Sequence, residues 1–206
     1  MRGTKRSKSC RIYEYFNNAK AKIRPLKSCL DLSALLKEKK MLLRPNIRKN
    51  RITDLSPQLL RRFGVKGLIL DVDNTLSTHH GEQLIDGLED WLDTMQKEGF
   101  KIIILSNSLE KRVRPFAEKI GLDYLAAGLK PLPFKYFAAL KRLGLSRRAV
   151  ATIGDQIFTD ILGGNAVGLT TVLLTPILPE RAWRFRLKRR LEKVVIRWYH
   201  IEETEG

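Results

Sequence analysis

Four short apolar runs, separated by helix-forming segments, constrain the fold of this chain more than any other feature. The runs are GLILDV at 67–72, KIIIL at 101–105, AVATI at 149–153 and TTVLL at 170–174. Runs of this length and composition are typical of strands buried on both faces. Strands that alternate with single helices form a parallel sheet through right-handed crossovers. We therefore predict a three-layer, Rossmann-like α/β fold.

The intervals between the runs carry apolar residues at helical spacing. In the helix that begins at Pro133, this spacing predicts that Phe134, Phe137 and Leu140 face the core. The intervals that follow the first and second runs are too short for an inserted cap domain, so we expect an open site. Helices are expected at 86–98, 109–120, 133–143 and 158–166.

Charge is distributed unevenly along the chain, whose formal net charge is +17. Residues 1–66 carry 19 Lys/Arg and 4 Asp/Glu, whereas residues 67–179 carry 12 and 13. Residues 180–206 carry 8 and 5. This division suggests a central domain that does chemistry and basic ends that meet an anionic partner, either lipid headgroups or nucleic acid.

The charge pattern also suggests three parts. We expect a basic extension at 1–41, helical or disordered, and a domain at 42–178. A basic amphipathic helix and an acidic tail follow at 179–206. A helix of this kind can lie in a membrane interface, or it can dock its apolar stripe on the domain and leave its charges in water. The stripe comprises Trp183, Leu187, Leu191, Val194, Val195 and Trp198, among Arg184, Arg186, Lys188, Arg189, Arg190, Lys193 and Arg197. A similar but less regular pattern occurs near 31–44.

Other features limit the location of the protein. Cys10 and Cys29 have no Cys or His at metal-ligand spacing, so we interpret them as free thiols in a reducing compartment. No apolar run approaches the roughly 18–20 residues that span a bilayer. No apolar h-region follows the basic start, so we expect no secretory signal. The acidic-poor first 30 residues are also compatible with a transit peptide. We favour a cytoplasmic, membrane-peripheral protein over an organellar one.

Polar residues follow the predicted strands at the points where they end. Asp71 and Asp73 follow the first strand, and Ser106 follows the second. Lys130 precedes a helix, and Asp155 follows the third strand. Because ligands bind beyond the carboxyl ends of the strands in an open parallel sheet, we expect these side chains to converge on one site.

The segments that carry these residues resemble a known family. DVDNT, LSNS, LKP and GDQIFTD, in this order, resemble the four motifs of phosphatases of the haloacid dehalogenase (HAD) superfamily, over roughly residues 65–175. The capless type, subfamily IIIA, with DNT and GDQxxTD resembles the YqeG family, as does the lead-in from Leu42. That family is related to the mitochondrial and plant phosphatidylglycerophosphate phosphatases. The resemblance implies a HAD fold without a cap and a role in phosphatidylglycerol biosynthesis.

The resemblance also implies roles for the residues around the phosphate. Asp71 would be the nucleophile that forms an aspartyl-phosphate, and Asp73 would protonate the leaving oxygen and then activate water. Thr75 would steady Asp73 or its loop by a hydroxyl hydrogen bond, and we group it with Ser106 and Asn107 as phosphate-binding. Together these residues predict hydrolysis of a phosphomonoester.

Charge balance at this site calls for cations. Lys130 would offset the charge of the transferring group. Asp71, the Asp73 backbone carbonyl and Asp155 offer the hard oxygen ligands that Mg²⁺ takes. Asp160 is included in the metal set, although we expect it to orient a metal-bound water or Lys130 rather than bind directly. The implied cofactor is therefore Mg²⁺.

The substrate remains open among several classes. We favour phosphatidylglycerophosphate, presented as a headgroup on an anionic phospholipid surface. A nucleic-acid end phosphatase would use the same positive charge, but aromatic residues for base stacking are sparse in the basic N-terminal segment. A soluble sugar-phosphate phosphatase and a non-enzymatic interaction protein on a HAD scaffold are further alternatives. We interpret His79 and His80 as exposed loop residues.

Overall fold

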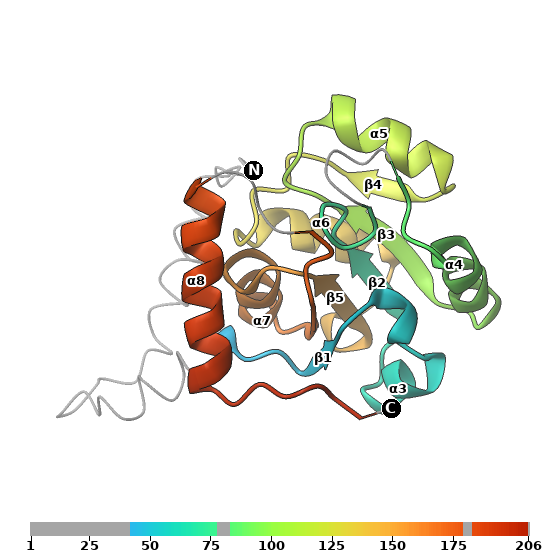
Figure 1. The fold of residues 1–206 in the computed structure, drawn as a ribbon. Coiled ribbons are helices and arrows are strands. Elements are labelled where there is room, and N and C mark those ends of the chain that lie inside the picture. Colours follow the sequence, from blue (N-terminus) through green and yellow to red (C-terminus); the bar gives the residue numbers. More distant parts are fainter. Residues whose placement is uncertain (1–41, 78–82, 179–182, 206) are drawn as a thin grey trace, which may run out of the picture. The chain divides into compact units, whose positions relative to one another are not determined.

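A six-stranded parallel sheet forms the centre of the domain that the structure describes (Figure 1). The computed structural model describes residues 42–77, 83–178 and 183–205. The strand order is β1-β6-β5-β2-β3-β4, and all neighbouring strands are parallel. The strands are β1 (Ile47–Lys49), β2 (Gly67–Leu70), β3 (Lys101–Leu105), β4 (Asp123–Leu125), β5 (Val150–Gly154) and β6 (Thr170–Leu174). The predicted α/β, Rossmann-like HAD fold is confirmed.

The two edge strands, β1 and β4, were not predicted. Each has only three residues, and each includes charged side chains, as in IRK and DYL. An edge strand is buried less completely than a central one, so it lacks the continuous apolar run by which β2, β3, β5 and β6 are recognised. The four inner strands could therefore be predicted from the sequence, and the two edge strands could not.

The four helices predicted at 86–98, 109–120, 133–143 and 158–166 agree closely with the structure, whereas the short helix at 57–62 was not predicted. The segment predicted at 158–166 contains a π-helical turn, η4 (Ile157–Ile161), that continues into α7. Short 3-10 turns lie at η1 (Ile52–Asp54) and η3 (Arg147–Ala149). The α-helices are α3 (Pro57–Arg62), α4 (Leu88–Lys97), α5 (Glu110–Lys119), α6 (Phe134–Leu143), α7 (Leu162–Val167) and α8 (Trp183–Trp198).

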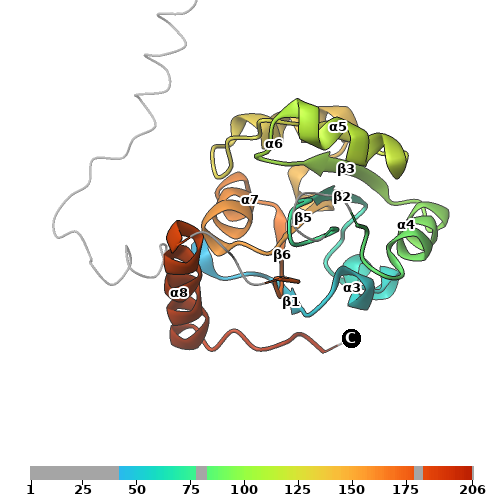
Figure 2. The same cartoon turned by 45° about the horizontal axis from the view of Figure 1, so that its top comes forward.

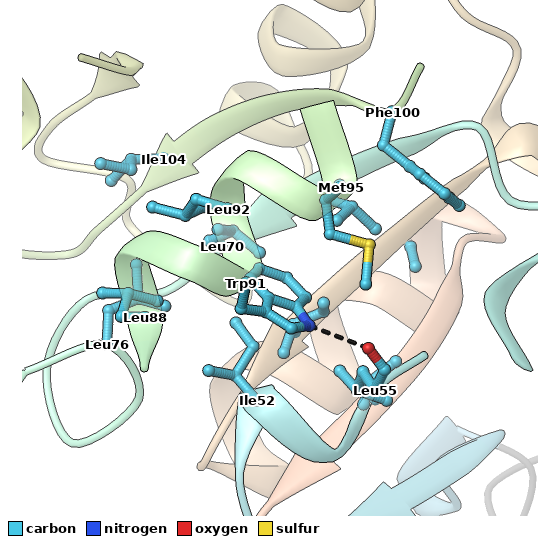
Figure 3. Packing of buried hydrophobic residues seen from close by; sticks show 14 of the residues in the cluster. Ile52, Leu55, Leu70, Leu76, Leu88, Trp91, Leu92, Met95, Phe100 and Ile104 are labelled. Atoms are coloured by element: carbon cyan, nitrogen blue, oxygen red, sulfur yellow. Dashed lines mark hydrogen bonds between the residues drawn. The ribbon is translucent and has the colours of Figure 1, made fainter. Parts of the chain in front are cut away.

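Helices cover both faces of the sheet. Side chains alternate along a strand, so Leu68 and Leu70 face one core while Ile69 faces the other. The first core includes residues of α3, α4 and α5, and the second includes residues of α6 and α7. In the first core, the buried Trp91 indole donates a hydrogen bond of 2.8 Å to the Leu55 carbonyl oxygen (Figure 3). This contact joins α4 to the segment that leads into α3.

The inward face of α6 differs from the prediction. Phe134 and Phe137 are exposed at 71% and 52%, whereas Tyr136 and Ala139 are fully buried. Both sets have helical spacing, so periodicity alone does not choose between them. Tyr136 faces inward because its hydroxyl finds a partner, the Thr159 carbonyl oxygen at 3.3 Å. The expectation that Phe134 and Phe137 face the core was wrong.

The C-terminal helix α8 packs beside the sheet by a face that includes only part of the predicted stripe (Figure 2). Val195 and Ile196 pack against Ile157, Ile161 and Leu173. Of the predicted stripe, Val195 docks on the domain, whereas four other members are exposed. The exposed members are Leu187, Leu191, Val194 and Trp198.

The tail that follows α8 runs along the edge strand β1. The Arg48 amide donates to the Thr204 hydroxyl at 3.0 Å, and the Thr204 amide donates to the Arg48 carbonyl at 2.9 Å. These bonds satisfy backbone groups that an open edge would leave unpaired. In the part of the chain that the structure describes, no helix is long and apolar enough to cross a membrane.

Several predictions lie outside the described residues. They are the extension at 1–41 with its two cysteines, most of the pattern near 31–44, the pair His79 and His80, and the side chain of Trp183. The predicted domain boundaries also remain predictions.

Candidate active site

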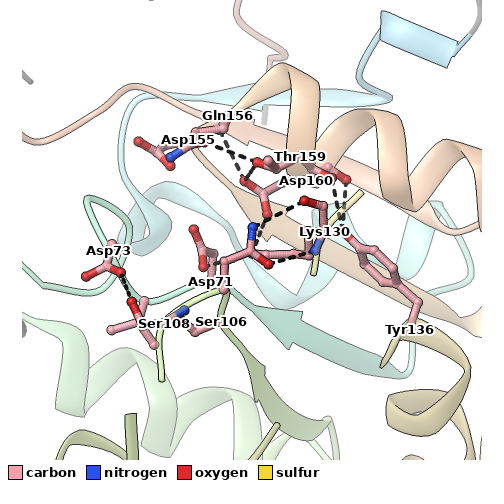
Figure 4. A network of polar contacts seen from close by, with 12 residues as sticks. Asp71, Asp73, Ser106, Ser108, Lys130, Tyr136, Asp155, Gln156, Thr159 and Asp160 are labelled. Atoms are coloured by element: carbon pink, nitrogen blue, oxygen red, sulfur yellow. Dashed lines mark hydrogen bonds and ion pairs between the residues drawn. The ribbon is translucent and has the colours of Figure 1, made fainter. Parts of the chain in front are cut away.

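The predicted site residues gather at the carboxyl edge of the sheet (Figure 4). Asp71 follows β2, Ser106 follows β3 and Asp155 follows β5. These three strands are neighbours in the order β5-β2-β3, and their carboxyl ends meet at one edge because they are parallel. Each of these three residues is at least 93% buried. The topology thus brings together residues that are up to 84 positions apart in the sequence.

Lys130 lies between two carboxylates. Its ammonium nitrogen is 2.8 Å from Asp71 Oδ1 and 2.6 Å from Asp160 Oδ1. The side chains of all three residues are almost completely buried, with exposures of 3%, 8% and 1%. The Asn107 side chain fixes the Lys130 backbone, because Oδ1 accepts from its amide at 2.7 Å and Nδ2 donates to its carbonyl at 3.2 Å. Asn107 therefore positions Lys130 in this structure, and its predicted contact with phosphate stays a prediction.

A close backbone approach holds Asp160 in place. Asp160 lies in the π-helical turn η4, a rare element that often marks functional sites. A Cβ atom on Gly154 would lie 2.4 Å from Asp160 Cγ, so only glycine permits this carboxylate to pack against the end of β5. Asp160 Oδ2 accepts from the Gln156 amide at 3.3 Å and from the Thr159 hydroxyl at 3.2 Å. The carboxylate is thus fixed with one oxygen on Lys130.

Three buried carboxylates form a group that fits a divalent cation. Oxygens of Asp71, Asp155 and Asp160 all lie within 4.8 Å of one another. Asp155 Oδ1 is buried and has no hydrogen-bond partner among the described residues. A buried oxygen without a partner is costly unless something binds it, and carboxylate oxygens are hard ligands for cations such as Mg²⁺. The acidic cluster therefore has the chemistry of a metal site.

The electrostatics of the cluster indicate crowded negative charge. Burial raises the pKa of Asp71 to about 6; Lys130 opposes this effect and Asp160 adds to it. Burial also raises the pKa of Asp155 well above its ordinary range, although the Arg189 guanidinium offsets part of the shift. Burial alone would lower the pKa of Lys130, but Asp160 and Asp71 together raise it. Lys130 therefore stays charged beside Asp71, whose carboxyl group burial makes harder to ionise.

Asp73 and Thr75 lie beside this cluster in different surroundings. Asp73 accepts a hydrogen bond from the Ser108 hydroxyl at 3.0 Å and forms an ion pair with Arg112 of α5. Its side chain is 34% exposed and is not part of the three-carboxylate group. Thr75 is buried, and its hydroxyl has no partner in the described ranges, so the expected hydrogen bond to Asp73 or its loop is not formed. Metal binding by the Asp73 carbonyl stays a prediction.

Sequence reasoning missed Ser108, Arg112, Arg189 and Glu192. Ser108 lies in the LSNS segment, so that motif could have indicated it. Glu192 had one signal, because it is the single acidic residue between positions 181 and 199, within a strongly basic helix. No signal in the sequence indicated Arg189, because it is one of several basic residues in the same helix. Arg189 forms an ion pair with Asp155 Oδ2.

Comparison with known proteins agrees with this geometry. Residues 35–168 match the family model of haloacid dehalogenase-like hydrolases, and the chain belongs to that family. It is 33% identical over 158 residues to the Bacillus subtilis protein named "Probable phosphatase YqeG", a match that covers 77% of this chain and 91% of the relative. The chain is thus a HAD phosphatase that hydrolyses phosphomonoesters.

Two further relatives are named for different substrates. The chain is 26% identical over 178 residues to phosphatidylglycerophosphate phosphatase 1 of Arabidopsis thaliana, covering 81% of this chain and 51% of the plant enzyme. It therefore spans about half the length of that relative. The ribulose-1,5-bisphosphate 5-phosphatase of Halopiger xanaduensis is 31% identical over 102 residues, covering 45% of this chain and 43% of that enzyme. Relatives of this chain are thus named for a lipid substrate and for a soluble one.

Proposed function

We propose that this protein is a Mg²⁺-dependent phosphatase that converts phosphatidylglycerophosphate to phosphatidylglycerol and phosphate at a membrane surface. The observation that carries the proposal is the buried Asp71–Lys130–Asp160 ion-pair group with Asp155 beside it. Catalysis of phosphoryl transfer consists largely of positioning and charge stabilisation, and this group supplies both.

The chemistry follows from the carboxylates of the site. The Asp71 carboxylate attacks phosphorus while the bond to the leaving oxygen breaks, and Asp73 donates a proton to that oxygen. Asp73, now ionised, takes a proton from water, whose oxygen attacks the aspartyl-phosphate and restores Asp71. Lys130 balances charge at Asp71 throughout, and Ser106 contacts the phosphoryl oxygens. A cation held by Asp71, Asp155 and Asp160 would supply further charge neutralisation at the phosphate.

Exposed apolar residues around the site favour a lipid substrate. One of them adjoins Ser108, and the others lie within four residues of Lys130. Exposed apolar side chains near a site favour an interaction surface, and the described loops beyond β2 and β3 contain no cap domain that would separate these side chains from a bilayer. These rim residues are Leu109 (73% exposed), Leu129 (65%), Leu132 (48%) and Phe134 (71%).

The outer face of α8 favours an anionic surface. Four exposed apolar residues, 51% to 75% accessible, form a stripe along it, and an exposed Arg or Lys precedes each of them. Residues 1–41 carry 12 Lys/Arg against 3 Asp/Glu, and a second copy of this chain would carry a net charge of +17. Like charge therefore disfavours both as binding partners of the basic outer face of α8. A bilayer with anionic lipids offers apolar depth and negative charge together, and each basic residue contributes about 1 kcal/mol there.

The central test is phosphate release from vesicles that contain phosphatidylglycerophosphate, with Mg²⁺ present. We expect release by the wild-type protein and none by Asp71→Asn. Parallel reactions with a 5′-phosphorylated oligonucleotide, soluble sugar phosphates and an aryl phosphate test the alternatives. Release from the oligonucleotide or a sugar phosphate alone would replace the lipid assignment, and no release from any substrate would indicate a non-enzymatic scaffold.

The apolar rim gives a second, independent test. Leu129→Ser and Phe134→Ser should each reduce vesicle hydrolysis roughly tenfold, because each loses the burial of one large apolar side chain. Phe63→Ser is the matched control: Phe63 is also exposed, but it follows α3 and precedes β2, at the opposite edge of the sheet from the site. Equal rates on vesicles for the rim variants and the wild type would remove the rim from the proposal.

A further inference from the structure

The helix α8 reaches the acidic cluster through one arginine. Arg189 Nη2 forms an ion pair with Asp155 Oδ2, and Arg189 Nη1 donates to the Asp155 carbonyl oxygen at 2.6 Å. The Asp155 side chain is completely buried, and that of Arg189 is only 15% exposed. One side chain of the C-terminal helix therefore binds both the backbone and the carboxylate of a predicted metal ligand.

Two neighbours of Arg189 secure the same turn. Glu192 is buried and accepts a hydrogen bond from the Ile157 amide at 2.9 Å, while its other oxygen accepts from Arg189 Nη1 at 2.9 Å. The Lys188 ammonium donates to Gln156 Oε1 at 2.5 Å. Three side chains of α8 thus hold the segment 155–157, which leads directly into the π-helical turn with Asp160.

The two oxygens of Asp155 have different surroundings. Oδ2 faces Arg189, whereas Oδ1 is buried without a hydrogen-bond partner among the described residues. The carboxylate lies close enough to Asp71 and Asp160 for one cation to contact all three. Outer partners that hold the second atom of a ligand commonly fix its orientation at metal sites. Arg189 also adds a second positive charge, after Lys130, beside three buried acids.

We propose that Arg189 is a positioning residue of the metal site, so that α8 forms part of the active site rather than an appendage. Arg189 binds Asp155 Oδ2 and thereby directs Oδ1 toward the cation; Glu192 holds Arg189 and the turn. The inference rests on the proposed metal-dependent function. The helix lies beyond residues 35–168, the part that matches the hydrolase family model, so it adds a contact to the family domain.

The test is calorimetric titration of the full chain with Mg²⁺ alone. Arg189→Gln should weaken Mg²⁺ binding roughly 10- to 100-fold, as is typical when an outer partner of a ligand is lost. Arg190→Gln is the matched control, because Arg190 is the adjacent exposed arginine of the same helix. Arg189→Lys keeps the charge but not the paired geometry, and it should recover part of the affinity.

A double substitution separates positioning from a general loss of stability. If Arg189 acts through Asp155, then Arg189→Gln should weaken Mg²⁺ binding little further in an Asp155→Asn background, because the two residues share one interaction. Unfolding temperatures in EDTA show which variants fold. Should Arg189→Gln fail to fold, the comparison of Arg189→Lys with Arg190→Gln decides, and equal Mg²⁺ affinity in those two would overturn the inference.

The titration distinguishes a failure of the positioning role of Arg189 from a failure of the proposed function. If the wild type and Arg189→Gln, both folded, bind Mg²⁺ equally, the positioning role is overturned while the phosphatase proposal stands. If the wild type binds no Mg²⁺, the metal-dependent mechanism and the inference both fail. Failure on phosphatidylglycerophosphate vesicles changes the substrate only, since the titration contains no substrate.

Discussion

At the scale of single residues, the proposed nucleophile Asp71 lies in surroundings that disfavour its charge. Asp71 is buried beside Asp160, and burial raises its pKa from 3.8 to about 6 even though Lys130 lies 2.8 Å away. A carboxyl group with a raised pKa binds its proton more tightly in the folded state than in the unfolded state. The metal-free protein should therefore lose stability as the pH rises from about 4 to about 6.

Replacing this carboxyl group should stabilise the metal-free protein while abolishing activity. Asp71→Asn removes an ionisable group whose shift of about two pKa units corresponds to at most about 3 kcal/mol. We expect the variant to unfold at a higher temperature than the wild type at pH 7.5 in EDTA, with the difference vanishing near pH 4. Thermal unfolding at both values checks this, and a lower unfolding temperature at pH 7.5 would contradict it.

Gly154 should tolerate no side chain. A Cβ atom there would lie 2.4 Å from Asp160 Cγ and 2.5 Å from Oδ2, so Gly154→Ala must displace Asp160 from Lys130 or shift the end of β5. We expect a loss of about 1–3 kcal/mol of stability and at least a tenfold loss of phosphatase activity. Chemical unfolding and an aryl phosphate assay measure both effects. Wild-type values for both would show that Asp160 can move at no cost.

At the scale of elements, the tail after α8 protects the edge of the sheet. Residues 201–204 bond to β1 through Thr204 and through the Ile201 carbonyl, which accepts from Arg48. Deleting residues 201–206 should lower the unfolding temperature by several degrees and promote self-association, because it exposes the backbone groups of β1. Thermal unfolding and light scattering test this, with Glu205→Gln as a control at an exposed tail position. An unchanged deletion variant would show that the edge needs no cover.

Local patterns in the sequence predicted the elements whose signals are local. β2, β3, β5 and β6 are continuous apolar runs, and a polar residue follows each of the three strands that carry the site, so the fold and the meeting of Asp71, Ser106 and Asp155 were predictable. The inward face of α6 was not, because Phe134 and Tyr136 both begin sets with helical spacing. The Arg189–Asp155 pair spans 34 residues and depends on how α8 packs, which periodicity does not contain.

At the scale of the whole molecule, a bound cation should act as a fold stabiliser. The three carboxylates of the cluster come from two separate segments, one after β2 and one after β5, so they form one site only in the folded chain. Mg²⁺ at a thousandfold excess over its dissociation constant should add about 4 kcal/mol and raise the unfolding temperature. Thermal unfolding with Mg²⁺ or EDTA checks this, and Asp155→Asn should lose the response. The same Mg²⁺ response in Asp155→Asn would assign the ion to another site.

The two faces of α8 have a joint consequence. Its inner face binds the turn that presents Asp155, and its outer face carries the exposed apolar and basic stripes. A partner that binds the outer face and shifts the helix would therefore also change the contact between Arg189 and Asp155. By thermodynamic reciprocity, occupation of the metal site must then alter the affinity of the outer face by the same factor. A vesicle affinity that differs between EDTA and Mg²⁺ would demonstrate this coupling between the metal site and the outer face of α8.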